Sequence, residues 1–156
     1  AWQAAGPGFG AGTVHLSKQI SYDNISVPNT PVSMCKSGAW GNKDYAVGDG
    51  MFLQTILING QPGLVISWYA FKDGLQYWIA GAGVFDGDTV IVYPAQVQGG
   101  QFPPAYSASD VTNTAWGEVK IKFLANGNAR VTSTPYLEGF EGAFFTIKQL
   151  AQPKGC

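Results

Sequence analysis

Glycine and proline are spread so densely through this chain that a long helix has no room to form. The 156 residues include 21 glycines and 9 prolines, and one or the other interrupts every window in which a helix might extend. Between these interruptions lie short stretches in which apolar and polar residues alternate, as in the strands of a half-buried sheet. The sequence therefore predicts an all-β protein with little or no helix.

The clearest predicted strand lies in the segment WGEVKIKFL. Val119, Ile121 and Phe123 alternate there with Glu118 and two lysines, and a hairpin turn at Asn-Gly follows the segment. We expect a single antiparallel meander of about eight or nine strands, closed as a barrel or folded as a sandwich. Besides this hairpin, the predicted strands are Thr13–Tyr22, Met51–Ile58, Leu64–Phe71, Leu75–Ala82, Thr89–Tyr93 and Ala143–Gln149.

The chain is expected to hold one domain, residues 13–156, after a tail of glycine, alanine and proline at residues 1–12. Residues 99–114 are too long for a hairpin loop and are predicted to form a crossover or a functional segment. Charged residues make up 12% of the chain, the net charge is −1, and lysine and arginine are scattered singly. This pattern disfavours binding to nucleic acid or to an anionic membrane, and no apolar run is long enough to span a bilayer.

Secretion is expected from the two ends of the chain. The first residues lack the features of a signal peptide and do not begin with Met, which favours a mature chain after signal removal. Cys35 and Cys156 are predicted to form a disulfide that ties down the C-terminus, with unpaired thiols or an intermolecular bridge as the alternatives.

Residues that could carry catalysis or bind a metal are few. His15 is the only histidine, so a site built from several histidines is excluded. Glu138 and Glu141 are the best carboxylate pair for acid–base chemistry, but a turn between glycines favours solvated side chains. Asp86 and Asp88 lie in a tight turn that lacks the ligand spacing of a calcium loop. We expect no enzyme activity, no metal site and no cofactor.

Aromatic residues crowd around the turn Asp73-Gly74 in the segment LVISWYAFKDGLQYWIAGAG, residues 64–83. A two-residue type I′ turn at this position predicts a hairpin with two unlike faces. Leu64, Ile66, Trp68, Tyr77 and Ile79 form an apolar face that is predicted to be core. The opposite face carries Tyr69, Phe71 and Trp78 beside small and polar residues, and it is predicted to contact a ligand or a partner, or to pack against a loop.

One long segment resembles uncharacterised secreted bacterial β-domains. It begins at Gly48 and reads GDGMFLQTILINGQPGLVISWYAFKDGLQYWIAGAGVFDGDTV, and GGQF and AWGEVKIKF follow it. The matching pattern is a Trp-Tyr strand, a turn, a second Trp strand and Gly-x-Gly, over roughly residues 38–134. The resemblance implies secretion and a β fold and names no chemistry. The order SGAWGNKDY before a meander also resembles the opening of avidin-type eight-stranded barrels, and no biotin-binding residue is carried over.

Two functions remain open at this point. The first is a secreted structural subunit that assembles with copies of itself into a filament or surface layer, by adding an N-terminal strand to a neighbour's sheet. The second is a β-barrel module that binds a carbohydrate or a small apolar ligand through Tyr69, Phe71 and Trp78. The residues predicted to serve assembly are Trp2, Phe9, Val14, Leu16, Ile20 and Tyr22.

Overall fold

A computed structural model describes residues 2–6, 9–14, 34–44, 49–102 and 104–153 of the chain. The described residues form strands and two single 3₁₀ turns, η1 (Met34–Lys36) and η2 (Ala108–Asp110), and contain no α-helix. This agrees with the prediction of an all-β protein. The strands are β1 (Trp2–Gly6), β2 (Phe9–Val14), β3 (Gly38–Asn42), β4 (Gly50–Ile58), β5 (Gln61–Lys72), β6 (Leu75–Asp86), β7 (Thr89–Val92), β8 (Ala95–Gly99), β9 (Val111–Ala115), β10 (Gly117–Phe123), β11 (Ala129–Pro135) and β12 (Ala143–Ala151).

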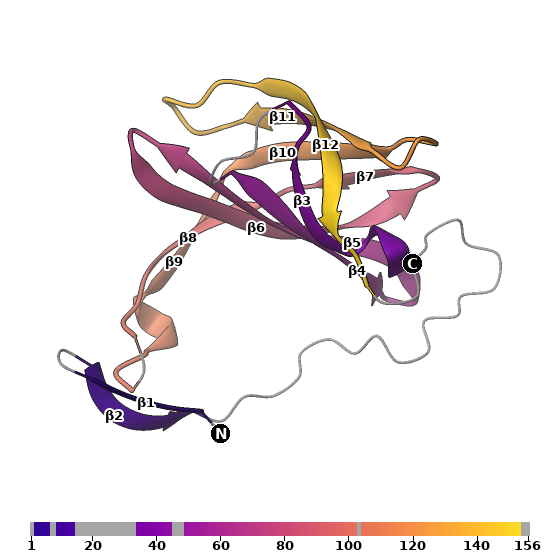
Figure 1. Cartoon of the computed structure of the whole chain (residues 1–156). Coiled ribbons are helices and arrows are strands. Elements are labelled where there is room, and N and C mark those ends of the chain that lie inside the picture. Colours follow the sequence, from indigo (N-terminus) through magenta and orange to yellow (C-terminus); the bar gives the residue numbers. More distant parts are fainter. Residues whose placement is uncertain (1, 7–8, 15–33, 45–48, 103, 154–156) are drawn as a thin grey trace.

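Eight strands close into an antiparallel barrel (Figure 1). The order around the barrel is β5, β4, β3, β12, β11, β10, β7 and β6, and the pairing of β6 with β5 completes the ring. Consecutive strands are joined mostly by short turns, but β12 pairs with β3 through contacts such as Ile147 with Asn42, which are distant in the sequence. Of the two closures that the sequence allowed, the fold is therefore the barrel.

Side chains fill the interior of the barrel. Alternate residues of β10, Val119, Ile121 and Phe123, are buried as their pattern predicted, and the lysines between them are exposed. Trp40 of β3 packs edge to face on Phe123, with 5.6 Å between the ring centroids. Because the middle of the barrel is a packed hydrophobic core, it leaves no open lumen there of the kind that larger barrels use for a ligand.

Two glycines of β6 allow the barrel to close tightly beside β7. A Cβ at Gly83 would lie 2.0 Å from the carbonyl oxygen of Ile91, and one at Gly81 would lie 2.8 Å from Cα of Pro94. Only a residue without a side chain fits where two backbones approach this closely. The Gly-x-Gly pattern at residues 81–83 therefore allows the backbone of β6 to contact the backbone at Ile91 and Pro94.

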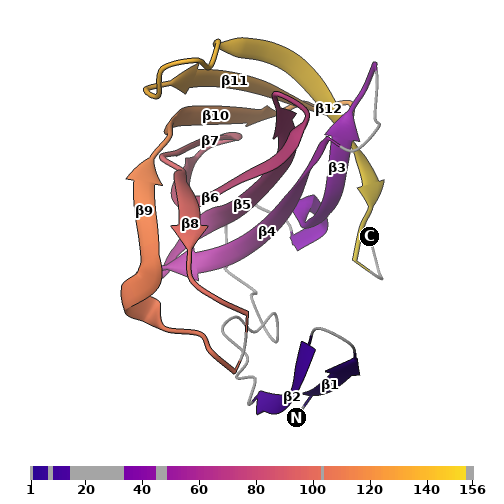
Figure 2. The ribbon, with the colours of Figure 1, turned by 90° about the vertical axis from the view of Figure 1, so that its left-hand side faces the viewer.

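Strands β8 and β9 extend from the barrel as a two-stranded arm (Figure 2). β8 pairs with β6 through Ile79 with Gln96 and Ala80 with Ala95, and β9 lies on its outer side. Residues 99–114 were predicted to form a crossover or a functional segment, and the crossover is wrong, because η2 and most of β9 lie in this segment and β9 returns antiparallel to β8. Strand character was missed there because Thr and Asn alternate without the apolar residues of a buried face.

At the N-terminus, β1 and β2 pair only with each other among the strands of the described residues, outside the barrel (Figure 1). The predicted strand Thr13–Tyr22 overlaps β2 at its first two residues, and the remaining eight lie outside the described residues. The assembly residues Leu16, Ile20 and Tyr22 fall in that remainder.

Of the two cysteines of the predicted disulfide, only Cys35 is among the described residues. No cysteine among them is a free thiol, and Cys35 lies in η1. The carbonyl oxygens of Cys35 and Ser37 both accept hydrogen bonds from the side-chain amide of Gln149, at 2.8 and 2.9 Å. Cys156 lies outside the described residues, so its bridge to Cys35 stays a prediction.

Candidate functional site

The hairpin of β5 and β6 has the register that the turn predicted. Asp73 and Gly74 have φ angles of 53° and 78°, both in the left-handed region that a type I′ turn requires. Across the hairpin Lys72 pairs with Leu75, Tyr69 with Trp78 and Trp68 with Ile79. The local turn chemistry therefore decides which residues share a face.

The two faces of this hairpin differ as expected. Leu64, Ile66 and Ile79 are buried in the barrel, and Trp68 and Tyr77 pack against that core. On the opposite face Tyr69, Phe71 and Trp78 are 52%, 53% and 41% exposed. With Gln76 they line a hollow of about 270 Å³ on the outside of the barrel. The structure thus brings the three predicted residues together, but it places them on the outer surface and not in a lumen.

The outer surface around these residues is uncharged over five neighbouring strands, β4, β5, β6, β8 and β9. Their only charged residues are Lys72 and Asp86, each the last residue of its strand. One row of paired residues crosses all five strands without a charge, and its members are Phe52, Ser67, Ala80, Ala95 and Ala115. We call this surface the uncharged sheet face.

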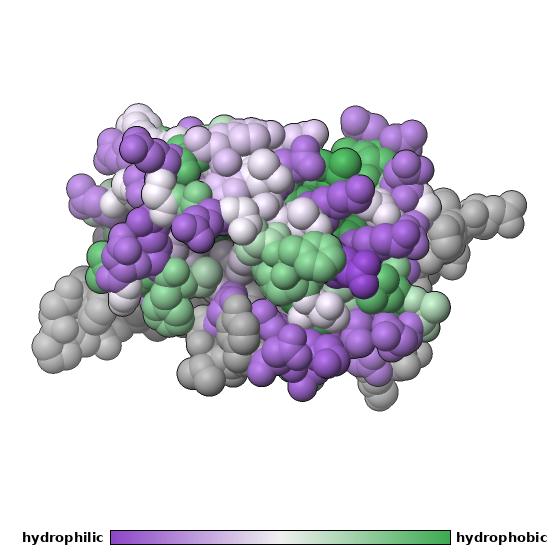
Figure 3. All heavy atoms as spheres, turned by 90° about the horizontal axis from the view of Figure 1, so that it is seen from above, coloured by the Kyte–Doolittle hydropathy of each residue, from purple (hydrophilic) through white to green (hydrophobic). Residues whose placement is uncertain are grey.

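The side of the barrel formed by β10, β11 and β12 has a different character. Lys120, Lys122, Arg130 and Lys148 are exposed there, among threonines and a few apolar residues. The view from above in Figure 3 shows hydrophilic and hydrophobic residues mixed over this side. Charged residues are therefore concentrated on one side of the barrel and are nearly absent from the other. Solubility alone does not require such a separation, since it is served by charges spread over the whole surface.

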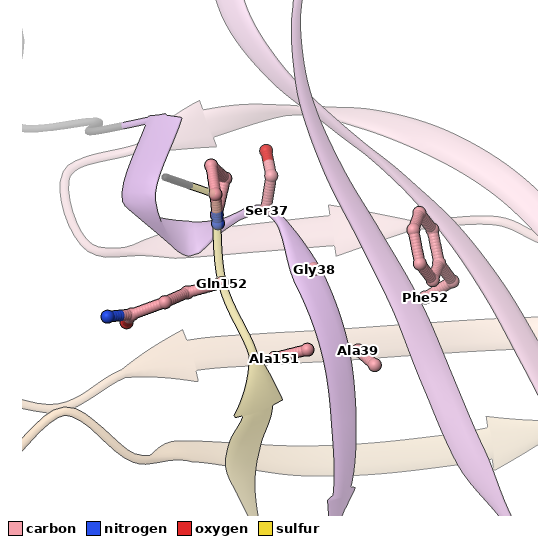
Figure 4. Close-up of a pocket in the computed structure, with 7 residues that line it drawn as sticks. Ser37, Gly38, Ala39, Phe52, Ala151 and Gln152 are labelled. Carbon is pink, nitrogen blue, oxygen red and sulfur yellow. The ribbon is translucent and has the colours of Figure 1, made fainter. Parts of the chain in front are cut away.

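An apolar groove borders the uncharged sheet face where β3, β4 and the end of β12 meet (Figure 4). Its volume is about 450 Å³, and Phe52, Ala39 and Ala151 present their side chains to it. Ser37 also lines the groove, and its buried hydroxyl accepts a hydrogen bond from the backbone N–H of Thr55 at 2.9 Å. Phe52 belongs to both the groove and the sheet face, so the two surfaces are continuous.

Five aromatic rings meet at one end of the barrel. Trp68 contacts Phe145 and Trp116, with centroid distances of 5.6 and 5.8 Å. Phe140 contacts Trp116 at 5.8 Å and Tyr77 at 4.9 Å. Sequence analysis identified Trp68 and Tyr77 as core but did not single out Trp116 or Phe140. These two rings come from chain segments between strands, where no periodic pattern indicates which way a side chain points.

The carboxylates that the sequence offered for catalysis and metal binding lie on the surface. Glu138 and Glu141 are both exposed, and Asp86 is exposed at the end of β6. Asp88 accepts a hydrogen bond from the hydroxyl of Thr89 at 2.8 Å and faces Lys122 at 3.8 Å, which is a turn contact. No group of three or more His, Cys, Asp or Glu residues lies together in the described ranges, and His15 falls outside them.

Among the described residues, none of the helical turns has the length or apolar character needed to cross a bilayer. Comparisons of the chain with protein families, with curated proteins and with solved structures found no match. The two resemblances implied a fold and secretion. Of these, the structure shows only the fold, which is an antiparallel barrel of eight strands.

Proposed function

We propose that this protein is a secreted, non-catalytic structural subunit that assembles with copies of itself. In this assembly an extended N-terminal segment of one copy pairs with β9 of the next copy. The observation that carries the proposal is the outer edge of β9, which pairs with no strand of the described residues and ends the uncharged sheet face. Strand addition of this kind satisfies the backbone groups of the edge and buries alternate side chains of the added strand.

The edge of β9 lacks the features that keep natural sheet edges from pairing. Lysine, proline and bulges commonly protect such edges. β9 has the sequence VTNTA, without charge or proline, and its register with β8 is regular from Ala95 with Ala115 to Gly99 with Val111. Residues 112–115 are exposed. An edge of this kind can pair with a strand of another chain. Because few charges oppose such pairing in this protein, the edge favours a specific partner strand.

The partner strand is assigned to the N-terminal segment. β1 and β2 pair with no barrel strand, so this part of the chain is not needed to close the barrel. Val14, Leu16, Ile20 and Tyr22 recur at even positions, which suits a strand that buries one face, although Lys18 interrupts the pattern. Trp2 and Phe9 add aromatic side chains that can pack on the uncharged sheet face.

Secretion is supported by the cysteine pair in the sequence, because disulfides persist in oxidising compartments. The non-catalytic role is supported by the exposure of Glu138 and Glu141, since acid–base catalysis needs carboxylates in distinct environments. The Tyr69, Phe71 and Trp78 group is assigned to contact between copies. Aromatic residues are enriched at the centre of such interfaces.

Size-exclusion chromatography with light scattering, followed by negative-stain microscopy, tests the proposal. The full chain is expected to form oligomers or filaments, and a chain without residues 1–22 is expected to stay monomeric with the same unfolding midpoint. Adding a peptide of residues 1–22 to the shortened chain should give a one-to-one complex. A full-length chain that remains strictly monomeric at high concentration would refute the proposal.

A matched pair of lysine substitutions locates the contact. Thr114→Lys places a charge on the edge strand, where it should weaken assembly at least about tenfold, equivalent to ~1.4 kcal/mol. Thr134→Lys places the same charge on β11, where Thr134 is exposed and pairs with Glu118, and should leave assembly unchanged. Equal effects of the two substitutions would show that β9 is not the acceptor.

A further inference from the structure

Two parts of the molecule outside the barrel are ribbons of only two strands. In the arm, β6 pairs with β8 at Ala95 and Gln96, so residues 97–99 of β8 pair with β9 alone among the described residues. At the N-terminus, β1 and β2 pair only with each other in the described part of the chain. A two-stranded ribbon by itself is at best marginally stable in water. Each ribbon would therefore gain stability from a further strand.

The N-terminal ribbon has a composition that gives it little stability of its own. β1 has the sequence WQAAG and β2 the sequence FGAGTV, so glycine and alanine make up at least half of each strand. Both residue types are depleted in strands, and glycine loses more conformational freedom on ordering than any other residue. We therefore expect the pairing of β1 with β2 to depend on contact with a further strand.

The two strands of the N-terminal ribbon differ in how well they are protected against further pairing. Ala4 pairs with Gly12 and Gly6 pairs with Phe9, so one residue of β1 lies opposite two residues of β2. The extra residue is a bulge in β2, and bulges are among the features that keep sheet edges from pairing. β1 has no extra residue, no proline and no charge. Its outer edge is therefore the one that can accept another strand.

The outer edge of β9 matches that of β1. Each strand has five residues, and neither contains a charged residue or proline. β9 is regular over its whole length, whereas the other edge of the arm, on β8, is partly occupied by β6. If β1 and β9 pair, the two ribbons become one sheet of four strands, in the order β8, β9, β1 and β2. The bulged strand β2 then ends the sheet.

The length of the chain allows these two edges to meet between copies. Within one copy, β1 pairs with β2 and with no strand of the barrel or the arm. Residues 15–33 connect β2 to η1, and a segment of that length can span at most ~65 Å. The diameter expected for a compact domain of this size is on the order of 40 Å. The N-terminal ribbon can therefore reach the arm of a neighbouring copy.

We propose that β1 of one copy is the strand that pairs with β9 of the next copy. This inference rests on the proposed function and identifies the strand that makes its contact. β2 lies on the far side of β1 and does not touch the arm. Each copy uses its arm on one neighbour and its N-terminal ribbon on another, so the contact joins two different surfaces. Contacts of this kind repeat from copy to copy and build rings or filaments.

Removal of β1 alone separates this inference from the proposed function. A chain without residues 1–6 loses β1, which the barrel does not use, and keeps the rest of the N-terminal segment. Its dissociation constant for assembly should be at least about tenfold higher than that of the full chain, measured by size-exclusion chromatography with light scattering. If both chains assemble equally well, β1 is not the donor, although strand addition by residues 13–22 still stands. If the full chain is monomeric, the proposed function itself is wrong.

Disulfide trapping in the full chain shows which strands are neighbours. One copy carries Ala4→Cys at the centre of β1, and the other carries cysteine at one of three positions around the centre of β9, Thr112, Asn113 or Thr114. Adjacent strands lie about 4.8 Å apart, within the reach of a disulfide, and the next strand lies at about twice that distance, beyond it. The mixture should therefore form a covalent dimer with Ala4→Cys. Gly12→Cys, on the residue of β2 that pairs with Ala4, is the matched control and should form none. No dimer with Ala4→Cys at any of the three positions, or an equal yield with Gly12→Cys, would overturn the proposal.

Discussion

The hydroxyl of Tyr77 makes a sharp prediction about stability, because the ring and the hydroxyl have opposite effects. The ring packs on Phe140 with a centroid distance of 4.9 Å and belongs to the aromatic end of the barrel. The hydroxyl is buried and has no hydrogen-bond partner among the described residues. Tyr77→Phe keeps the first contact and removes the second group, so the variant should be more stable than the original protein.

The size of this effect follows from the cost of an unsatisfied hydroxyl. Taking the lower part of the ~1–3 kcal/mol range, since Tyr77 is only partly buried, the free energy of unfolding should rise by about 1 kcal/mol. For a chain of 156 residues this corresponds to a rise in Tm of about 2–4 °C. A substitution of one atom rarely stabilises a protein by this much, so the result is informative.

Urea unfolding followed by tryptophan fluorescence measures the change. The midpoint should move to higher urea with an unchanged slope, which indicates that stability changed and the exposed area did not. Tyr69→Phe is the control, because its hydroxyl is on the exposed outer face, and its effect should stay within about 0.5 kcal/mol. A loss of 1 kcal/mol or more in Tyr77→Phe would refute the reasoning, since it would mean that the hydroxyl has a stabilising partner.

The same group predicts a pH dependence. Burial raises the pKa of the Tyr77 hydroxyl above its ordinary value of 10.0. In the unfolded chain the hydroxyl ionises near the ordinary value, while in the folded protein it stays neutral. This ionisation therefore leaves the free energy of unfolding unchanged below about pH 10 and lowers it as the pH rises from there through the folded-state pKa, because only the unfolded chain has released the proton. This loss should be absent in Tyr77→Phe and present in Tyr69→Phe.

Two further predictions concern the closure of the barrel and of the chain. Gly83→Ala puts a Cβ 2.0 Å from the carbonyl oxygen of Ile91, a backbone atom that cannot rotate away, and should lower the free energy of unfolding by about 3 kcal/mol or more. A cost below about 1 kcal/mol in urea unfolding would show that β6 and β7 are not in such close contact. The predicted bridge between Cys35 and Cys156 would close a loop of more than 100 residues, and the double variant to serine should lose roughly 4 kcal/mol. Mass spectrometry after alkylation without reductant should detect no modified cysteine, and two alkylated thiols on a monomer would disprove the bridge.

Some of the candidate surface could be predicted because its geometry is local. The turn at Asp73-Gly74 needs positive φ at both residues, and this turn type pairs Tyr69 with Trp78 and leaves Leu64 and Ile66 on the other side. The two-residue period of a strand then carries the division along the whole hairpin. The absence of helix was predictable for the same kind of reason, since the spacing of glycine and proline acts on each window separately.

The cluster of aromatic rings at one end of the barrel could not be predicted in this way, because its residues are brought together only by the closed barrel. Trp116 precedes β10, Phe140 precedes β12, and Tyr77 lies in β6, so no pattern in the sequence relates them. The same holds for the choice of barrel over sandwich, which depends on the pairing of β12 with β3.

By itself, the sequence determined the all-β class, most strands of the barrel and the register of the β5–β6 hairpin. These properties depend on the preferences of neighbouring residues. Only the tertiary structure decided that Tyr69, Phe71 and Trp78 lie outside the barrel, and that β9 is the last strand of the sheet among the described residues. These depend on which distant strands pair, and that choice is made by the packing of the whole core.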